Sequence, residues 1–273
     1  MDHQITSIPL ATGVTLECLE QGREDGVPVI FLHGFADSWR SFEPVLPFLP
    51  PQIRVVAPSF RGHGESSRPA SGYAITDLAA DVGALHEALG LGPAVVVGHS
   101  LGSAVALRFA IDQPRRTRGL VLVGATPGIR SSPAAREFWD DQLAELTDPA
   151  KSSFVRSMTE AMVARPVPEA LLATAVAESS KVHPDVWRAF FDARWRGDGD
   201  YATELGRVAA PTQIVWGGRD PRYTRADQDA LVTGIPDARL VVWNGAGHAL
   251  HWEEPARFAS DVLGFVERLG DRG

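Results

Sequence analysis

The apolar residues of this chain repeat in two alternating patterns. Short runs rich in Val, Ile and Leu are each followed by a longer segment in which apolar residues recur every three or four positions. The short runs are typical of buried strands, and the longer periods are typical of amphipathic helices. Strands are predicted at residues 14–20, 29–32, 53–57, 95–97, 120–123, 213–216 and 239–243.

Helices are predicted between these strands, and Thr76 is expected to cap one of them because its hydroxyl can accept a hydrogen bond from the first turn. Repeated strand–helix units imply an α/β fold with a mostly parallel sheet that helices cover on both faces. Ligands of such sheets bind at the carboxyl ends of the strands, so functional residues are expected there. The predicted helices are residues 37–49, 76–89, 101–112, 226–232 and 254–269.

The alternation stops between residues 131 and 195, where the pattern is helical throughout. Breaks in this stretch are predicted at Pro149 and at residues 166–168 and 183–184. Because the strand–helix rhythm then resumes, the stretch is interpreted as an insertion and not as a tail. We predict a core of residues 1–128 and 204–273 and an inserted helical unit of residues 129–203.

The motif Gly-x-Ser-x-Gly stands at residues 98–102, directly between a predicted strand and a predicted helix. A strand that becomes a helix without a loop must bend sharply, and the residue at the bend then exposes its side chain. Gly98 and Gly102 flank the bend because a Cβ atom there would collide with the turn or with the packed helix. Ser100 is therefore predicted to be a nucleophile at the carboxyl end of a strand.

A serine hydroxyl is a weak nucleophile that needs a base, and the base needs an orienting acid. Asp220 and His248 each follow one of the last two predicted strands. The chain order Ser100, Asp220, His248 is the nucleophile–acid–histidine order of one hydrolase fold. The nearest alternatives, Asp227 and His251, fall within helical patterns.

These motifs resemble those of the α/β-hydrolase superfamily, in the branch that has a serine nucleophile and a helical cap inserted after the sixth strand. The resemblance spans nearly the whole chain outside residues 129–203 and implies a mostly parallel eight-stranded sheet flanked by helices. The matching segments are residues 33–35, 61–66, 98–102, 217–220, 247–248 and 252–255.

The resemblance implies a role for each member of the site. Ser100 would attack an acyl carbonyl, and His248 would take its proton and return it to the leaving group. Asp220 would hold the imidazole in the correct tautomer. The backbone N–H groups of Phe35 and Leu101 would form the oxyanion hole.

Four further residues are expected to support this machinery. By the resemblance, His33 braces the loop that contains the oxyanion glycine, Gly34. His99 is expected to support the elbow, and His63 is expected to hold its own loop. No histidine pair has zinc-site spacing with a third ligand, so we expect neither a metal nor another cofactor.

The resemblance implies a serine hydrolase that cleaves a carboxylic ester or lactone of a small, partly apolar substrate through an acyl-enzyme. The serine separates this chain from the epoxide hydrolases and haloalkane dehalogenases, which carry an aspartate at the elbow. Carbon–carbon bond hydrolases of vinylogous diketones and cofactor-free perhydrolases stay open as alternatives. Acyltransferases and ligand-sensing signalling proteins of the same fold stay open as well.

The side chains of the predicted cap indicate what kind of substrate the site would accept. If two or three of its aromatic residues face the cleft, the substrate has an apolar acyl or alcohol part. Arg188, Arg194 and Arg196 are interpreted as solvated surface residues in preference to ligands of a substrate carboxylate. The large apolar cap residues are Phe138, Trp139, Phe154, Met158, Met162, Trp187, Phe190, Phe191 and Trp195.

The composition of the chain indicates which kinds of binding partner are expected. The chain has 273 residues, a net charge of −8 and a pI of about 5.5, which argues against a surface for nucleic acid or anionic membranes. Cys18 is the single cysteine and is expected to be a buried apolar residue, which fits a reducing cytoplasm. The first residues do not read as a signal peptide, and no apolar run approaches the ~20 residues of a membrane helix. We expect a cytoplasmic protein whose partner is a small-molecule substrate, and the sequence leaves a homodimer open.

Overall fold

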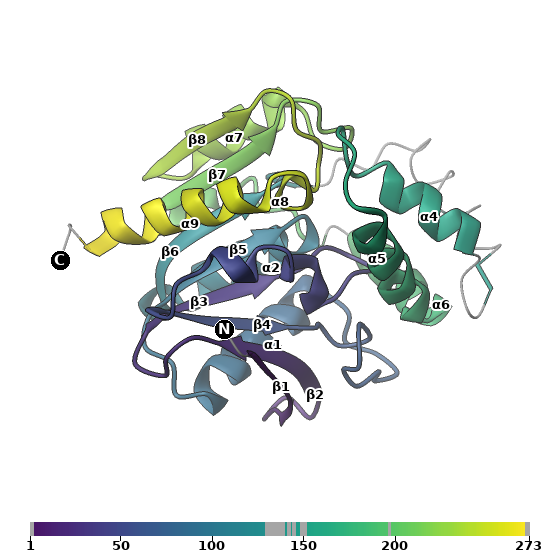
Figure 1. The fold of residues 1–273 in the computed structure, drawn as a ribbon. Helices are drawn as coiled ribbons and strands as arrows, with labels where there is room; N and C mark the ends of the chain where they lie inside the picture. The colour runs from purple at the N-terminus through teal and green to yellow at the C-terminus, as the bar shows by residue number, and fades with distance from the viewer. Residues whose placement is uncertain are drawn as a thin grey trace.

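The computed structural model describes residues 3–128, 140, 143, 146–147, 152–195 and 198–270. Its centre is an eight-stranded sheet in the order β1-β2-β4-β3-β5-β6-β7-β8 (Figure 1). β2 pairs antiparallel with β1 and β4, and every other pair of neighbours is parallel, so the predicted mostly parallel sheet is confirmed. The strands are His3–Pro9 (β1), Thr15–Gln21 (β2), Val27–Leu32 (β3), Ile53–Pro58 (β4), Ala94–His99 (β5), Thr117–Val123 (β6), Thr212–Gly217 (β7) and Ala238–Trp243 (β8).

Helices cover both faces of the sheet because alternate strand residues belong to two different buried clusters. Val96 of β5 belongs to the cluster that includes side chains of α1, α2 and α7. Its neighbours Val95 and Val97 belong to the cluster that includes side chains of α9. The carboxyl ends of the parallel strands therefore carry the loops that can form a site. These helices are Ile75–Ala88 (α1), Leu101–Asp112 (α2), Arg225–Gly234 (α7) and Pro255–Gly270 (α9).

Three described helices are inserted between β6 and β7 and lie to one side of the sheet in Figure 1. The predicted breaks at 166–168 and 183–184 are confirmed, because Pro168 is the N-cap of α5 and α6 begins at Pro184. Pro149 lies outside the described residues, and the boundaries at 128/129 and 203/204 stay predictions. The inserted helices are Ser152–Glu160 (α4), Glu169–Lys181 (α5) and Pro184–Trp195 (α6).

The prediction of one helix at residues 37–49 is wrong. This stretch instead forms two short 3₁₀ helices, η1 (Trp39–Phe42) and η2 (Leu46–Phe48). The physical reason is the pair Pro44 and Pro47, which lack the backbone N–H that a continuous helix needs. The short helices still pack their apolar residues into the cluster that contains α9.

Two further local predictions need correction at the start of α1 and of the chain. Thr76 does not cap α1, because Ala74 is the N-cap residue and its N–H donates to the Asp77 carboxylate at 3.0 Å. The N–H of Ile75, in the first turn, instead donates to the Asp198 carboxylate at 2.7 Å. β1 was not predicted because most of its side chains are exposed, which leaves no pattern of buried positions to detect. Cys18 is buried and unpaired, as expected.

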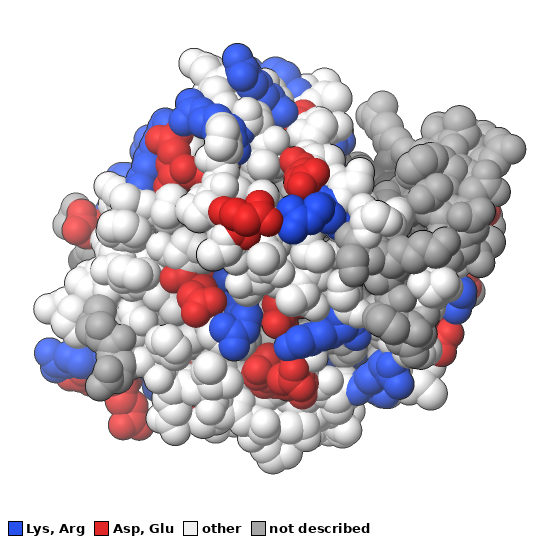
Figure 2. Space-filling view, turned by 45° about the vertical axis from the view of Figure 1, so that its right-hand side comes forward, with Lys and Arg blue, Asp and Glu red and all other residues white. Residues whose placement is uncertain are grey.

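Charged side chains are spread over the surface. Figure 2 shows acidic and basic residues interleaved across the face in view. Some of them join distant elements, such as Arg108 with Glu204 at 3.1 Å and Arg54 with Glu20 at 3.2 Å. Among the helices that the structure describes, none is both long enough and apolar enough to cross a membrane.

Candidate active site

Ser100 occupies a strained bend between β5 and α2. Its φ of +53° and ψ of −112° lie in a backbone region that non-glycine residues rarely adopt. The flanking glycines are required, because a Cβ at Gly98 would lie 2.2 Å from the carbonyl oxygen of Gly102. A Cβ at Gly102 would lie 2.0 Å from the carbonyl oxygen of Leu32 in β3. The close packing of strand and helix therefore holds the serine at the tip of the turn.

Asp220 and His248 are hydrogen-bonded at the carboxyl ends of β7 and β8. The Nδ1–H of His248 donates to Oδ2 of Asp220 at 2.8 Å, and both side chains are fully buried. The other oxygen of Asp220 accepts the backbone N–H of Arg222 at 2.7 Å and of Tyr223 at 3.2 Å. These bonds fix the carboxylate and thereby the tautomer of the ring. Nε2 of His248 is left as a buried acceptor without a hydrogen-bond partner among the described residues.

Two contacts bring the Ser100 bend to the His248 loop. The backbone N–H of Ser100 donates to the carbonyl oxygen of Val123 at 2.9 Å, and the next residue, Gly124, lies against the His248 ring. From the other side, Nε2–H of His99 donates to the carbonyl oxygen of His248 at 3.2 Å. The serine, the histidine and the aspartate thus gather at one edge of the sheet.

The predicted oxyanion loop lies beside the same bend. A Cβ at Gly34 would lie 3.6 Å from Cβ of Ser100, an ordinary contact, but only 3.0 Å from Nδ1 of His99, so a larger residue would press on the His99 ring. Among the described residues, the backbone N–H groups of Phe35 and Leu101 donate to no main-chain oxygen. The N–H of Leu101 opens α2, where helix geometry leaves the first N–H groups free to bind an anion.

His33 ties the oxyanion loop to the strand beside it. Its Nδ1–H donates to the carbonyl oxygen of Gly34 at 2.7 Å, while its Nε2 accepts the N–H of Phe60 at 2.9 Å. Burial lowers the pKa of His33 well below its ordinary value, with the neighbouring His63 adding to the effect. The ring is therefore neutral and can brace both loops. His63 itself donates from Nδ1 to the carbonyl oxygen of Arg61 at 3.0 Å, and burial lowers its pKa to about 4.

His251 is engaged away from the candidate nucleophile. Its Nε2 is hydrogen-bonded to Oγ of Ser41 at 3.0 Å, and its ring centroid lies 4.6 Å from that of His99. Burial lowers the pKa of His251 to about 3 and that of His99 well below its ordinary value. Both rings are buried neutral groups that support the bend from beneath. Within the described part of the chain, no three His, Cys, Asp or Glu residues are grouped as metal ligands would be.

Aromatic residues of the cap pack onto Phe35, next to the oxyanion glycine. Phe190 stacks on the Phe35 ring with centroids 4.1 Å apart, and Trp187 meets it edge-on at 4.7 Å. Arg188 pairs with Asp185 at 3.2 Å at the surface, as expected for a solvated residue. Other predicted cap residues lie outside the described residues or have side chains that are not described: Phe138, Trp139, Arg194, Trp195 and Arg196.

Three residues at the site were not assigned roles from the sequence. Gly124 contacts the His248 ring, Glu253 binds the His248 loop, and Asp37 is buried two residues beyond Phe35. Burial raises the pKa of Asp37 to about 7, against the opposing effect of hydrogen bonds from Ser41 and from the Ser38 N–H. A glycine directly after a buried strand was a visible signal for Gly124. The other two depend on contacts between segments far apart in the sequence.

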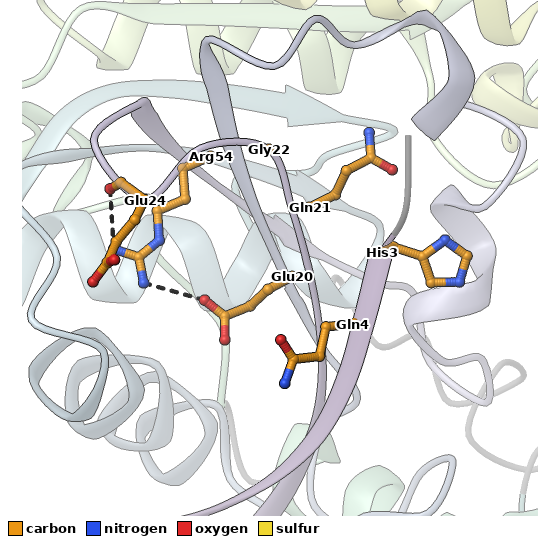
Figure 3. Close-up of a pocket in the computed structure, with 7 residues that line it drawn as sticks. All are labelled: His3, Gln4, Glu20, Gln21, Gly22, Glu24 and Arg54. Carbon is orange, nitrogen blue, oxygen red and sulfur yellow. Dashed lines mark hydrogen bonds and ion pairs between the residues drawn. The ribbon is translucent and has the colours of Figure 1, made fainter.

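A polar cavity of about 460 Å³ lies elsewhere, where β1, β2 and β4 meet (Figure 3). Arg54 bonds there to the Glu20 carboxylate at 3.2 Å and to the backbone carbonyl oxygen of Glu24 at 3.4 Å. None of the candidate catalytic residues lines it. The candidate catalytic residues lie at the Ser100 bend, away from this cavity.

Known proteins share this architecture. A family model described as alpha/beta hydrolase fold matches residues 27–255. A 2-hydroxy-6-oxononadienedioate/2-hydroxy-6-oxononatrienedioate hydrolase from Pseudomonas putida is 31% identical, with 89% of each chain covered. Among solved structures, Est816, described as an N-acyl homoserine lactone degrading enzyme, is 29% identical with a TM-score of 0.80 over 95% of this chain and 100% of its own. The esterase RhEst1 from Rhodococcus sp. ECU1013 is 27% identical with a TM-score of 0.84 over 97% of this chain and 99% of its own.

Proposed function

This chain belongs to the alpha/beta hydrolase fold family, and from that premise we propose that it is a serine hydrolase of carboxylic esters or lactones. One observation carries the proposal. The Asp220–His248 pair is buried, its tautomer is fixed, and its Nε2 has no hydrogen-bond partner among the described residues. The loop that carries it packs against the strained Ser100 bend through Gly124 and His99. A neutral imidazole with a free acceptor nitrogen is what a serine hydroxyl needs in order to lose its proton.

The proposed reaction has two steps. Ser100 Oγ attacks the carbonyl carbon while Nε2 of His248 takes the hydroxyl proton, and the imidazolium is stabilised by Asp220. The oxyanion is bound by the N–H groups of Phe35 and Leu101, each of which is worth on the order of 3 kcal/mol in the transition state. The imidazolium returns its proton to the leaving alcohol, and water then cleaves the acyl-enzyme by the same route.

The neighbourhood of Phe35 supports an apolar group in the substrate. Phe190 and Trp187 close over the Phe35 ring, so a molecule that enters beside the oxyanion loop meets aromatic surface. Pockets of this kind bind through apolar contact and use a few polar groups for orientation. The similarity to a lactone-degrading enzyme and to an esterase agrees with such a substrate.

Labelling and mutation of the serine test this function. We expect a fluorophosphonate to label Ser100, and Ser100→Ala to lose hydrolysis of a panel of aryl esters and lactones by more than about 10³-fold. Ser103→Ala is the matched control: Ser103 Oγ donates to the Gly98 carbonyl oxygen at 2.6 Å, so its loss removes a structural bond and leaves the nucleophile. Full ester hydrolysis by Ser100→Ala would refute the proposal.

Carbon–carbon bond hydrolysis is the second candidate, favoured by the 31% identity to the Pseudomonas putida hydrolase. The same serine, histidine and aspartate can serve either reaction, so the site geometry alone fits both. A vinylogous diketone included in the substrate panel separates them. Turnover of the diketone to a carboxylic acid and a ketone, together with no turnover of esters or lactones, would establish the second candidate over the first.

A further inference from the structure

The loop that carries His248 is tied on both sides to one segment of the cap. Before the histidine, the N–H of Gly247 donates to Oε1 of Glu253 at 2.9 Å. The same oxygen accepts the N–H of Ala164, from the α4–α5 connection, at 2.7 Å. After the histidine, the N–H of Ala249 donates to the carbonyl oxygen of Met162 at 2.8 Å. One carboxylate oxygen thus joins cap and loop beside the candidate base.

The close approach of the two segments is built into the sequence. A Cβ at Gly247 would lie 2.6 Å from the Ala164 nitrogen and 2.9 Å from Oε1 of Glu253. Arg165 continues the contact, because its Nε–H donates to the carbonyl oxygen of Gly245 at 3.1 Å. The cap connection of residues 162–165 therefore lies directly against residues 245–249.

The Glu253 side chain makes no further hydrogen bond or ion pair with the described residues. Its two bonds to Gly247 and Ala164 are the hydrogen bonds of its side chain among the described residues, and its second oxygen, Oε2, is buried without a partner. Removal of the side chain would leave two partly buried N–H groups unpaired, which is costly. A carboxylate that is bound only by these two donors fixes the position of the cap segment relative to the His248 loop.

We propose that Glu253 is a positioning residue, which sets the His248 imidazole through the Gly247 N–H and couples that setting to the seating of the cap. A shift of residues 162–165 is transmitted through Oε1 to the residue before the histidine. This role rests on the proposed function, because His248 must be the base for its position to matter to turnover. An error of about 1 Å in such a base lowers the rate by about 10²-fold.

Three substitutions at position 253 and one control substitution at position 169 test the role. Glu253→Ala removes the acceptor. Glu253→Asp keeps the charge but is one methylene too short to reach both donors, and Glu253→Gln keeps the length and an acceptor oxygen. Glu169→Ala is the matched control, because Glu169 is an exposed cap carboxylate that pairs with Arg156 and, among the described residues, is not bonded to the loop.

We expect the labelling rate of Ser100 by a fluorophosphonate to fall about 10- to 100-fold in Glu253→Ala and Glu253→Asp. With a short aryl acetate, kcat should fall by a similar factor while KM stays within about twofold. Glu253→Gln should recover most of the rate, and Glu169→Ala should match the wild type. The low-field proton resonance of the Asp220–His248 bond should broaden or shift in the Ala and Asp variants only.

Either a folded Glu253→Ala or a folded Glu253→Asp that labels at the wild-type rate with an unchanged proton resonance would overturn the role of Glu253. The Asp variant decides the matter if the Ala variant does not fold. Failure of the proposed function is seen separately, as a wild-type enzyme that is not labelled at Ser100. The proton resonance still reports whether Glu253 positions the ring in that case.

Discussion

Gly124 lies directly against the imidazole of His248. A Cβ at position 124 would stand 2.9 Å from both Nδ1 and Cε1 of the ring, closer than real Cβ atoms approach other heavy atoms. The φ of Gly124 is +53°, a value that L side chains rarely adopt. The His248 side chain, in the loop after β8, therefore restricts position 124 to glycine.

Gly124→Ala should displace the imidazole from its position. We expect kcat of ester hydrolysis to fall about 10- to 100-fold, because the base moves relative to the serine. The free energy of unfolding should fall by about 1–3 kcal/mol from the positive φ and the contact. Steady-state kinetics and urea denaturation of the purified variant measure the two effects.

Gly83→Ala is the matched control for this substitution. Gly83 lies inside α1, and nothing stands within 4 Å of a Cβ built there. The variant should keep wild-type kinetics and gain about 0.5–1 kcal/mol of stability, since alanine favours a helix interior. Equal kinetics for Gly124→Ala and Gly83→Ala would contradict the steric account.

The sequence was sufficient to predict candidate site residues that follow a strand in a recognisable order, and their catalytic roles stay predictions. Ser100 and Asp220 follow the fully buried strands β5 and β7, and His248 follows the partly buried strand β8. Apolar runs of this kind are local features of the sequence. The contact of Gly124 with the ring, and of Glu253 with the cap, arises only when distant segments approach. The sequence shows a glycine directly after a strand at position 124, but neither its contact with the ring nor the contact of Glu253 with the cap can be read from a linear pattern.

The fold shows the same division. Strands buried on both faces were predicted within a few residues, because burial selects continuous runs of Val, Ile and Leu. β1 was missed because it lies at the sheet edge with most side chains exposed, and residues 37–49 were misread because their apolar spacing outweighed Pro44 and Pro47. The position of β1 in the sheet is a tertiary feature that local spacing does not show, whereas the two prolines are local signals that the prediction of one helix did not weigh.

Asp220→Asn tests whether Asp220, and not Asp227, is the acid that orients His248. The amide cannot hold the Nδ1–H tautomer of His248, so we expect kcat to fall by about 10³- to 10⁴-fold with little change in the fold. Circular dichroism and ester turnover at neutral pH measure the two effects.

Asp227→Asn is the comparison. Asp227 accepts hydrogen bonds from the N–H and the hydroxyl of Thr224 at the start of α7. Its replacement should cost about 0.5–2 kcal/mol of stability and leave turnover unchanged. A large loss of turnover in Asp227→Asn, with Asp220→Asn active, would assign the acid to position 227.

The titration of Asp37 should lower the free energy of unfolding as the pH rises toward neutrality. Burial raises the pKa of its carboxyl to about 7 in the folded protein, and nearby Glu178 adds to the effect, whereas an unfolded aspartate titrates near pH 3.9. Between these two values the folded state binds more protons than the unfolded state, so stability is lost as pH rises through this window. Below about pH 4 both states are protonated, and the carboxyl contributes no pH dependence there.

Asp37→Asn removes this titration and keeps an oxygen that can accept the Ser38 N–H, which Asp37 accepts at 2.8 Å. We expect the variant to gain about 1–3 kcal/mol relative to the wild type between pH 4.5 and pH 8, with the gain complete above about pH 7. Urea denaturation of both proteins across this range measures the difference. Asp229→Asn, which removes an exposed carboxylate paired with Arg225, controls for the loss of one negative charge. If the stability of Asp37→Asn relative to the wild type stayed constant or declined with rising pH, the carboxyl would titrate in the fold at or below its unfolded value, and the raised pKa would be wrong.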